Sequence, residues 1–399
     1  MNMFRTLLFL LTPWSLSAKP EDLVLHTEIE SSQVKVDLFI PKEARPVRGL
    51  LIHAAHYQLK TTGRWPTLCR ELGFAHLVTN INLKLNNRPR RLREAMNAAL
   101  QDFAKTTGKP ELTQVPRVGV GMSAGGMCIP MLMEEPDKLL TNAVSCSWVT
   151  DPAKIGPERA RIPEMYVIGA KPDGFKMLPA IDNFYVPSVK AGNPWALGLQ
   201  HECKHDWANS GTLFVPWIRG IAALRIPENT KPGEAVPLKP VSFQSGWRGD
   251  RSTIKGQFAT VVPYEKYQGD PAHTVWLPDR ATAYVWRAWQ TKNASFQITA
   301  ETSDKKKKLP KFKPRSSFGM SVTHGQNLAL GIQPLRDGPH ASKVVFYAED
   351  QILGSPGPDG IFHWKNPSKR AHAIWAEYEI DDQKAATNPA LICVEEAAK

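Results

Sequence analysis

A serine between two closely spaced glycines is the residue best suited to chemistry in this chain. Residues 118–126 read Val-Gly-Val-Gly-Met-Ser-Ala-Gly-Gly, which contains the pattern Gly-x-Ser-x-Gly with its serine at Ser123. The pattern follows a β-branched run and precedes a helix-compatible stretch, as in a nucleophile elbow. Glycines in such a turn let strand and helix approach closely, while the serine hydroxyl is presented at the tip. We therefore predict that Ser123 is a nucleophile.

A nucleophilic serine needs a base, and the base needs an acid that orients it. After an elbow of this kind the acid comes next along the chain and the histidine last. Asp173 follows a predicted strand at 165–169, and His205 follows a predicted strand at 195–199. The predicted triad is therefore Ser123, Asp173 and His205.

Other residues compete for two of these roles. Asp151 and Asp182 are alternatives for the acid, and His201 is an alternative for the base. Any of these aspartates could instead cap a turn, which is a common structural role for aspartate in loops.

The oxyanion of an acyl-transfer intermediate also needs backbone donors. The N–H of Ala124, directly after the nucleophile, is one predicted donor. The other is expected in the loop after a predicted strand at 49–54, from Ala55 or His56. Loss of one such donor typically costs about 3 kcal/mol of transition-state stabilisation.

A competing motif overlaps the predicted base. Residues 201–205 read His-Glu-Cys-Lys-His, which matches the zinc-protease pattern His-Glu-x-x-His. That pattern binds zinc only when a helix places both imidazoles on one face. The preceding residues 195–199 read as a strand, so the context disfavours a metalloprotease, and we predict no metal or organic cofactor.

The surrounding elements alternate between strands and helices. Alternating residues at 23–29 and 34–40 predict a hairpin, and the apolar run 49–55 predicts a strand covered on both faces. Further strands are expected at 75–81, 118–121 and 143–149, and helices at 65–72, 90–107, 124–135 and 213–224. This order predicts an α/β fold with a mainly parallel sheet between helices.

Residues from about 20 to 230 resemble the α/β-hydrolase superfamily, in particular secreted esterases similar to dienelactone hydrolases and polyester depolymerases. The elbow, the sequence Ile-Pro-Glu-Met-Tyr-Val-Ile-Gly before Asp173, and Lys204-His205-Asp206 with Arg225-Ile226-Pro227 carry the resemblance. It implies a serine esterase that acts on a small or polymeric ester through an acyl-enzyme. A non-catalytic cell-surface binding protein on a hydrolase scaffold is the competing class.

The C-terminal part of the chain changes in character. Residues 237–291 are rich in tryptophan and are expected to extend the hydrolase domain, with Asp279 capping a helix at 280–289. Short alternating strands in residues 317–399 predict a β-sandwich. This segment resembles bacterial immunoglobulin-like modules, whose core strands match residues 343–347, Gly354, 364–366 and 373–378. The resemblance implies a spacer or a weak contact with a surface or glycan.

Composition and termini set the remaining expectations. The chain has 399 residues and a net charge of +12, but a run of lysines and one arginine in a linker at 301–316 carries much of that charge. Its prolines and single aromatic favour a solvated linker over a nucleic-acid site. Residues 1–18 read as a signal peptide, which predicts export to the periplasm or the exterior, with a hydrolase domain at 19–300. The five cysteines are dispersed, so at most two disulfides could form.

Overall fold

The computed structural model describes most of the chain. The described residues are 21–29, 34–55, 59–80, 88–147, 149, 151–171, 181–200, 203–207, 209–231, 234–252, 258–291, 295–302, 320–335 and 340–397. The predicted signal peptide and most of the predicted basic linker lie outside these ranges. Within them, no helix is both long and apolar enough to cross a membrane.

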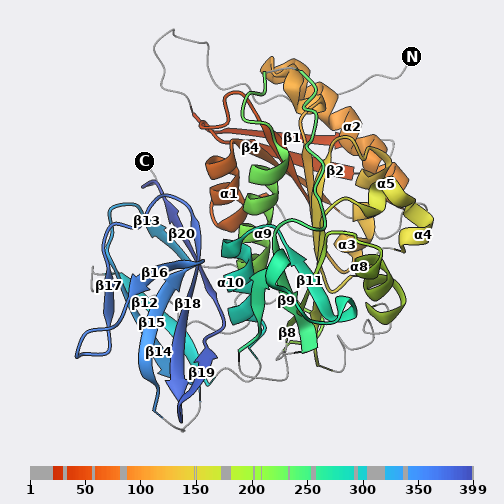
Figure 1. The fold of residues 1–399 in the computed structure, drawn as a ribbon. Coiled ribbons are helices and arrows are strands. Elements are labelled where there is room, and N and C mark those ends of the chain that lie inside the picture. Colours follow the sequence, from red (N-terminus) through yellow and green to blue (C-terminus); the bar gives the residue numbers. More distant parts are fainter. Residues whose placement is uncertain are drawn as a thin grey trace, which may run out of the picture.

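An eight-stranded sheet forms the centre of the larger part of the molecule (Figure 1). Its order is β1-β2-β4-β3-β5-β6-β7-β8; the pairs β1–β2 and β2–β4 are antiparallel and all later pairs are parallel. The strands are β1 (Leu23–Ile29), β2 (Val34–Ile40), β3 (Gly49–Ala55), β4 (Phe74–Asn80), β5 (Arg117–Met122), β6 (Leu139–Ser145), β7 (Glu164–Gly169) and β8 (Trp195–Gln200). The predicted α/β fold class is confirmed.

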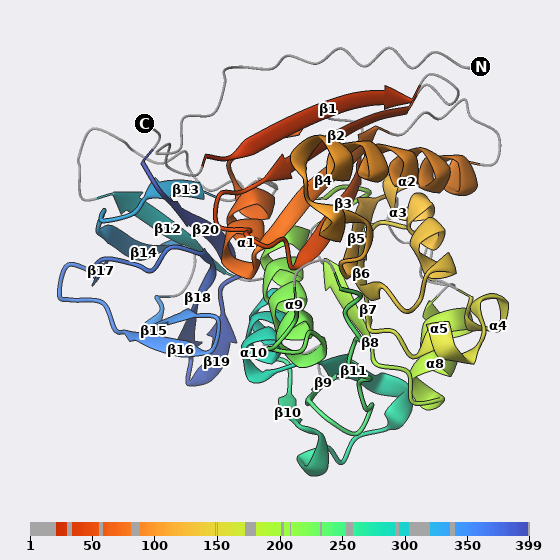
Figure 2. The same cartoon turned by 90° about the horizontal axis from the view of Figure 1, so that it is seen from above.

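Helices cover both faces of this sheet (Figure 2). Successive side chains of a strand point to opposite faces. Leu51 of β3 accordingly packs in a cluster with residues of α1 and α9, whereas Leu50 and Ile52 pack in a cluster with residues of α2. The helices are α1 (Arg64–Leu72), α2 (Arg88–Thr107), α3 (Ala124–Cys128), α4 (Pro152–Ile155), α5 (Pro157–Ala160), α8 (Val186–Lys190) and α9 (Ser210–Arg225).

Two elements near the elbow differ from the sequence expectation. The helix predicted at 124–135 ends as an α-helix at Cys128 and continues as the 3-10 helix Ile129–Glu134. Pro130 stands at the start of that second segment, where its missing N–H costs no helical hydrogen bond. The strand predicted at 143–149 begins and ends four residues earlier, as β6.

The tryptophan-rich segment adds a small sheet and a helix to the body. Strands β9 (Trp247–Asp250), β10 (Val261–Pro263) and β11 (Thr274–Leu277) pair in the order β10-β9-β11, and α10 (Arg280–Trp289) follows. The Asp279 carboxylate accepts a hydrogen bond from Thr282 N at 2.7 Å, so the predicted helix cap is confirmed. Trp276 and Trp286 are fully buried, which supports the packing role expected for these residues.

The C-terminal part consists of two further β-sheets that face each other. One sheet has the order β12-β14-β17, and the other β13-β20-β18-β15-β16 with β19 beside β18. Ile298 and Leu330 from the first sheet share an apolar cluster with Phe346 and Ile374 from the second, as in a β-sandwich. The strands are β12 (Phe296–Thr302), β13 (Met320–Thr323), β14 (Leu328–Pro334), β15 (Ser342–Ala348), β16 (Gln351–Gly354), β17 (Phe362–Trp364), β18 (Ala371–Ile380), β19 (Gln383–Ala386) and β20 (Ala390–Glu395).

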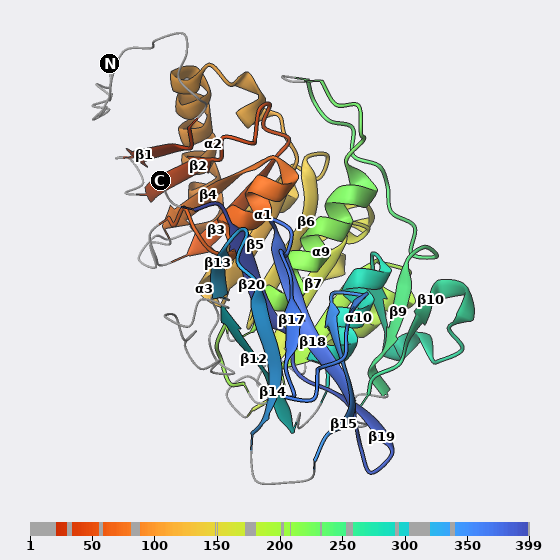
Figure 3. The same ribbon diagram turned by 90° about the vertical axis from the view of Figure 1, so that its left-hand side faces the viewer.

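The sandwich packs directly against α1, α9 and α10 (Figure 3). Ala373 and Leu391, on its outer face, belong to the same apolar cluster as Trp217 of α9. Glu395, at the end of β20, accepts hydrogen bonds from Gly63 N and Thr67 Oγ1, both at 2.7 Å, and so holds the start of α1. The predicted domain boundary near residue 300 falls inside β12, which pairs with β14.

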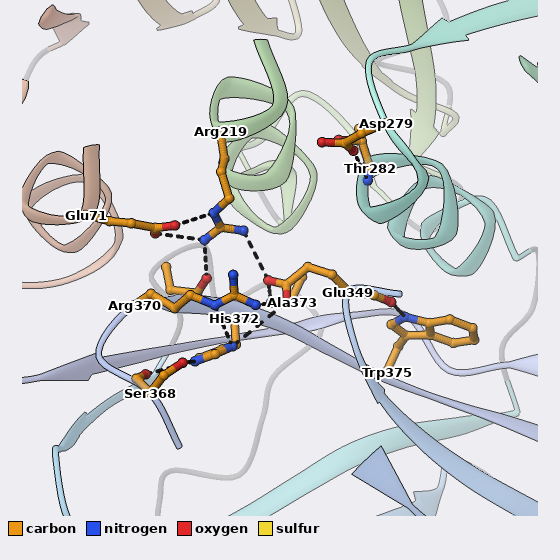
Figure 4. A network of polar contacts seen from close by, with 11 residues as sticks. Glu71, Arg219, Asp279, Thr282, Glu349, Ser368, Arg370, His372, Ala373 and Trp375 are labelled. Atoms are coloured by element: carbon orange, nitrogen blue, oxygen red, sulfur yellow. Dashed lines mark hydrogen bonds and ion pairs between the residues drawn. The ribbon is translucent and has the colours of Figure 1, made fainter. Parts of the chain in front are cut away.

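A buried polar network also crosses this contact (Figure 4). Arg219 of α9 donates to Glu71 of α1 and to Glu349, at 2.9 Å and 3.3 Å respectively. Glu349 in turn accepts from Arg370 at 2.9 Å. Burial alone would raise the pKa of Glu349, but the His372 hydrogen bond and nearby positive charges outweigh it and lower that pKa to about 2.

We predict that Glu349→Ala destabilises the protein by about 3 kcal/mol or more at pH 7, because it removes a buried carboxylate and leaves the largely buried Arg219 without one of its counter-charges. The depressed pKa stabilises the folded protein above pH 4.5, and this contribution is lost as the pH falls toward 2. Urea unfolding at pH 7 and pH 3 measures both effects. The control is Asp350→Ala, which removes a half-exposed pair with Arg280 and should cost about 1 kcal/mol or less. Equal losses for the two variants would contradict the prediction.

Candidate functional site

Ser123 stands between the end of β5 and the start of α3. Its backbone has φ 50° and ψ −119°, a conformation that non-glycine residues seldom adopt. A Cβ at Gly121 would lie 2.6 Å from Gly125 C, so only glycine permits strand and helix to approach this closely. Because α3 begins at Ala124, the N–H of Ala124 has no carbonyl partner within the helix. These are the local features of a nucleophile elbow.

The neighbouring strand β6 ends beside this turn. Ser123 N donates to Ser145 O at 3.0 Å. The Ser145 hydroxyl lies 2.9 Å from Ser210 Oγ, and Ser210 in turn donates its hydroxyl hydrogen to Trp207 O. Ser145 is therefore bonded on one side to the elbow and on the other to the start of α9.

Cys146 extends this connection to the segment that carries His205. Its thiol lies 3.7 Å from Lys204 O and 3.4 Å from Asp206 O, the two carbonyls that flank His205 in sequence. Cys146 also has a positive φ of 48°, and its N–H donates to Val167 O at 2.8 Å. The backbone around His205 therefore contacts Cys146, the residue directly after Ser145, which accepts the hydrogen bond from Ser123 N.

The end of β7 also contacts the segment that carries His205. Lys171 N donates to Cys203 O at 2.9 Å. A Cβ at Gly169 would collide with Lys204 O and lie 2.8 Å from Cys203 O. The two backbones are therefore in direct contact, and this contact requires a glycine at position 169.

Aromatic packing fixes the far end of the segment. The Trp207 ring meets the His53 ring edge-on at a centroid distance of 5.5 Å, and the Arg64 guanidinium lies 5.3 Å from the Trp207 ring. His53 is fully buried, and burial, with the charges of His76 and Arg64, lowers its pKa well below the usual value. His53 is therefore neutral and has a packing role.

Only some of the predicted site residues lie in the described part of the chain. Ser123, Ala124, His205 and the backbone of Ala55 are described, whereas Asp173, His56 and the alternative base His201 lie outside the described residues. The segments of Ser123 and His205 lie close together through the contacts above, yet no hydrogen bond joins their side chains.

The three candidate acids differ in their surroundings. Asp151 accepts a hydrogen bond from Ala153 N at 3.1 Å and pairs with Lys154, so it caps the start of α4. Asp182 is exposed on the helical turn Ile181–Tyr185. Asp173 comes two residues after Lys171, whose N–H is bonded to Cys203, itself two residues before His205. Asp173 itself lies outside the described residues, so its role as the acid stays a prediction.

The second oxyanion donor is expected at the end of β3. β3 pairs in parallel with β5, and Ala54 stands opposite Gly121 in that pairing. The Ala55 backbone therefore lies at the same edge of the sheet as the end of β5, and its role as a donor stays a prediction.

The zinc-protease alternative lacks its helix. β8 ends at Gln200, residues 203–207 form no helix, and α9 begins only at Ser210. The described residues also contain no group of three or more side chains able to hold a metal ion. His201 and Glu202 of this motif lie outside the described part of the chain.

Sequence reasoning missed the residues that connect the two segments. Ser145, Cys146 and Gly169 join elements that are far apart in the chain, since the Cys146 contacts span 58 and 60 residues. No local motif marks them. The only signal in the sequence is that Gly169 ends the predicted strand 165–169. Ser145 and Cys146 fall inside the predicted strand 143–149, because the observed strand ends four residues earlier.

No protein-family model and no curated protein matches the sequence. Solved structures match about half of the chain at low identity. One of two fungal esterases from Rhizomucor miehei has 10% identity and a TM-score of 0.37 over 52% of this chain and 86% of that one. An esterase/lipase from an uncultured bacterium has 13% identity and a TM-score of 0.35 over 52% and 88%. An S-formylglutathione hydrolase from Agrobacterium tumefaciens has 10% identity and a TM-score of 0.33 over 52% and 96%.

We predict that Gly169→Ala destabilises the protein by about 2 kcal/mol, because the added methyl group overpacks the contact with Lys204. Hydrogen exchange at residues 203–207 should accelerate at the same time. Denaturant unfolding and exchange mass spectrometry measure the two effects. The control is Gly357→Ala, where the nearest atom to an added Cβ is Asp359 Oδ1 at 3.1 Å, the end of a side chain that can move. Unchanged exchange at 203–207 would contradict the proposed contact.

Proposed function

We propose that the chain is a serine hydrolase that cleaves a carboxylic ester. The observation that carries the proposal is the backbone of Ser123, which adopts a rare positive φ between a buried parallel strand and a helix start. Sparsely populated conformations of this kind persist where the surrounding structure enforces them, and they cluster at active sites. The eight-stranded sheet supplies the carboxyl edge at which α/β folds bind ligands.

The proposed reaction uses the predicted residues in the roles of a Ser-His-Asp triad. Ser123 Oγ attacks the ester carbonyl carbon while His205 takes the hydroxyl proton. His205 returns that proton to the leaving alcohol, and a water activated by the same imidazole then hydrolyses the acyl-enzyme. Asp173 orients the imidazole and stabilises its positive charge.

Charge that develops on the carbonyl oxygen needs donors that are already in place. The Ala124 N–H is available at the start of α3, and Ala55 or His56 supplies the second donor. The substrate in this proposal is a small or polymeric ester, without a metal or organic cofactor and without nucleic acid. Export of the chain, to the periplasm or beyond the cell, belongs to the same proposal and rests on residues 1–18.

Two alternatives to the serine hydrolase are a non-catalytic binding protein and a zinc protease. A non-catalytic binding protein would keep the architecture and show no turnover. A zinc protease would be inhibited by a chelator and would resist a serine-directed phosphonate. The non-helical segment at 203–207 favours the serine mechanism over the zinc one.

We predict that Ser123→Ala lowers p-nitrophenyl acetate turnover by about a thousandfold or more, because the nucleophile is removed while the fold is kept. A fluorophosphonate label should modify the wild-type protein at Ser123 and leave the variant unlabelled. The matched control is Ser147→Ala, a nearby buried serine whose hydroxyl has no partner among the described residues and whose loss should leave turnover unchanged. Full turnover in Ser123→Ala would refute the proposal.

We predict that Asp173→Asn lowers turnover by about a hundredfold or more, because the imidazole loses the acid that orients it. Asp151→Asn and Asp182→Asn should stay within about twofold, since these aspartates cap or project from helices. The pair His205→Gln and His201→Gln separates the base from its alternative in the same assay. A large loss confined to Asp151→Asn or to His201→Gln would overturn the corresponding assignment.

A further inference from the structure

Two cysteine thiols lie near the same carbonyl oxygen, that of Asp206, in the segment that carries His205. Cys146 Sγ lies 3.4 Å from Asp206 O, and Cys203 Sγ lies 4.0 Å from the same atom. The separation of the two sulfurs therefore cannot exceed the sum of these two distances. Both side chains are buried and neither is in a disulfide.

The backbones of both cysteines are held by the strand that lies between them. Cys146 N donates to Val167 O of β7, and Cys203 O accepts from Lys171 N just after the end of β7. The residues between Cys203 and Trp207 are exposed at Lys204, His205 and Asp206. A small oxidant can thus reach the pair when this short exposed segment opens locally.

We propose that Cys146 and Cys203 are a dithiol pair that oxidises to a disulfide across the base of residues 203–207. With oxidised glutathione as oxidant, the Cys203 thiolate attacks the glutathione disulfide and releases one glutathione thiol. The Cys146 thiolate then attacks Cys203 Sγ and releases the second. Two protein S–H bonds are lost and one S–S bond forms, and the two electrons and two protons end on the two glutathione thiols.

Oxidation changes the support of His205. In the dithiol state, the Cys146 thiol is a donor for the carbonyls of Lys204 and Asp206 on either side of His205. The disulfide removes that hydrogen and draws Cys203 toward Cys146, to a sulfur separation of about 2 Å. The backbone at His205 must shift, so the oxidised protein has lower ester turnover. This consequence, but not the formation of the disulfide, rests on the proposed function.

The first test is the disulfide itself, measured on the full chain equilibrated with oxidised glutathione. Non-reducing peptide mapping should recover the Cys146–Cys203 cross-linked peptide from the wild type and from Cys69→Ser, which removes a buried thiol on α1. The peptide should be absent from Cys203→Ser and from Cys146→Ala. Recovery of only other pairings, or of none, from the oxidised wild type would overturn the proposal.

The second test measures how oxidation affects residues 203–207 and ester turnover. Hydrogen exchange at 203–207 should differ between the oxidised and reduced wild type, and ester turnover should fall about tenfold or more on oxidation and return with dithiothreitol. Cys203→Ser should show neither response. A mapped cross-link with unchanged exchange and turnover would overturn the effect on His205. Absence of turnover in every state would refute the esterase proposal, whereas the cross-link and the exchange difference would still support the dithiol pair.

Discussion

The candidate site depends on one corner of backbone, where β6 ends at Ser145 and Cys146. Ser145 accepts the Ser123 N–H, and Cys146 contacts both carbonyls that flank His205. Each of these bonds contributes only about 1 kcal/mol on its own. Their combined effect is geometric, because strand ends in a parallel sheet share one edge and cannot shift independently of one another. Ser123 and His205, the proposed nucleophile and base, are distant in the chain and are thereby brought to the same edge.

The C-terminal sandwich packs against α1, α9 and α10, the helices next to that edge. α9 starts directly after the His205 segment, and Arg219 within α9 is bonded to Glu71 of α1 and to Glu349 of the sandwich. The sandwich also shares the main apolar cluster with α1, α9 and α10. A module joined in this way does not behave as a loosely attached spacer, because moving it would expose apolar surface and separate buried charges. The resemblance to immunoglobulin-like modules, and the weak binding that it implies, stay predictions.

The sequence predicted elements well where a local rule decides the outcome. The hairpin, the strands β3 and β5, and the Asp279 cap all follow from alternation, apolar runs and capping chemistry. It predicted poorly where two rules compete. The run after Ser123 has helical composition, yet the chain changes to a 3-10 helix at Ile129, where a proline removes a donor. The pairing of β12 with β14 could not be predicted, because the two strands are distant in the chain and no local pattern connects them.

The overlap of the zinc-protease motif with the proposed base shows the limit of motif reading. Taken alone, residues 201–205 fit a zinc site, because the spacing of the two histidines suits one face of a helix. That spacing suits a zinc site only if the chain is helical there, and the described residues 203–207 form no helix. β8 runs to Gln200, and the described residues 203–207 form a non-helical segment with bonds to the end of β7 and to Cys146. The close contact of Gly169 with Lys204 leaves no room for these residues to move toward β7. The position of the His205 backbone is therefore set by contacts with β6 and the end of β7, more than 30 residues upstream, and the proposed role of His205 as the base rests on that position.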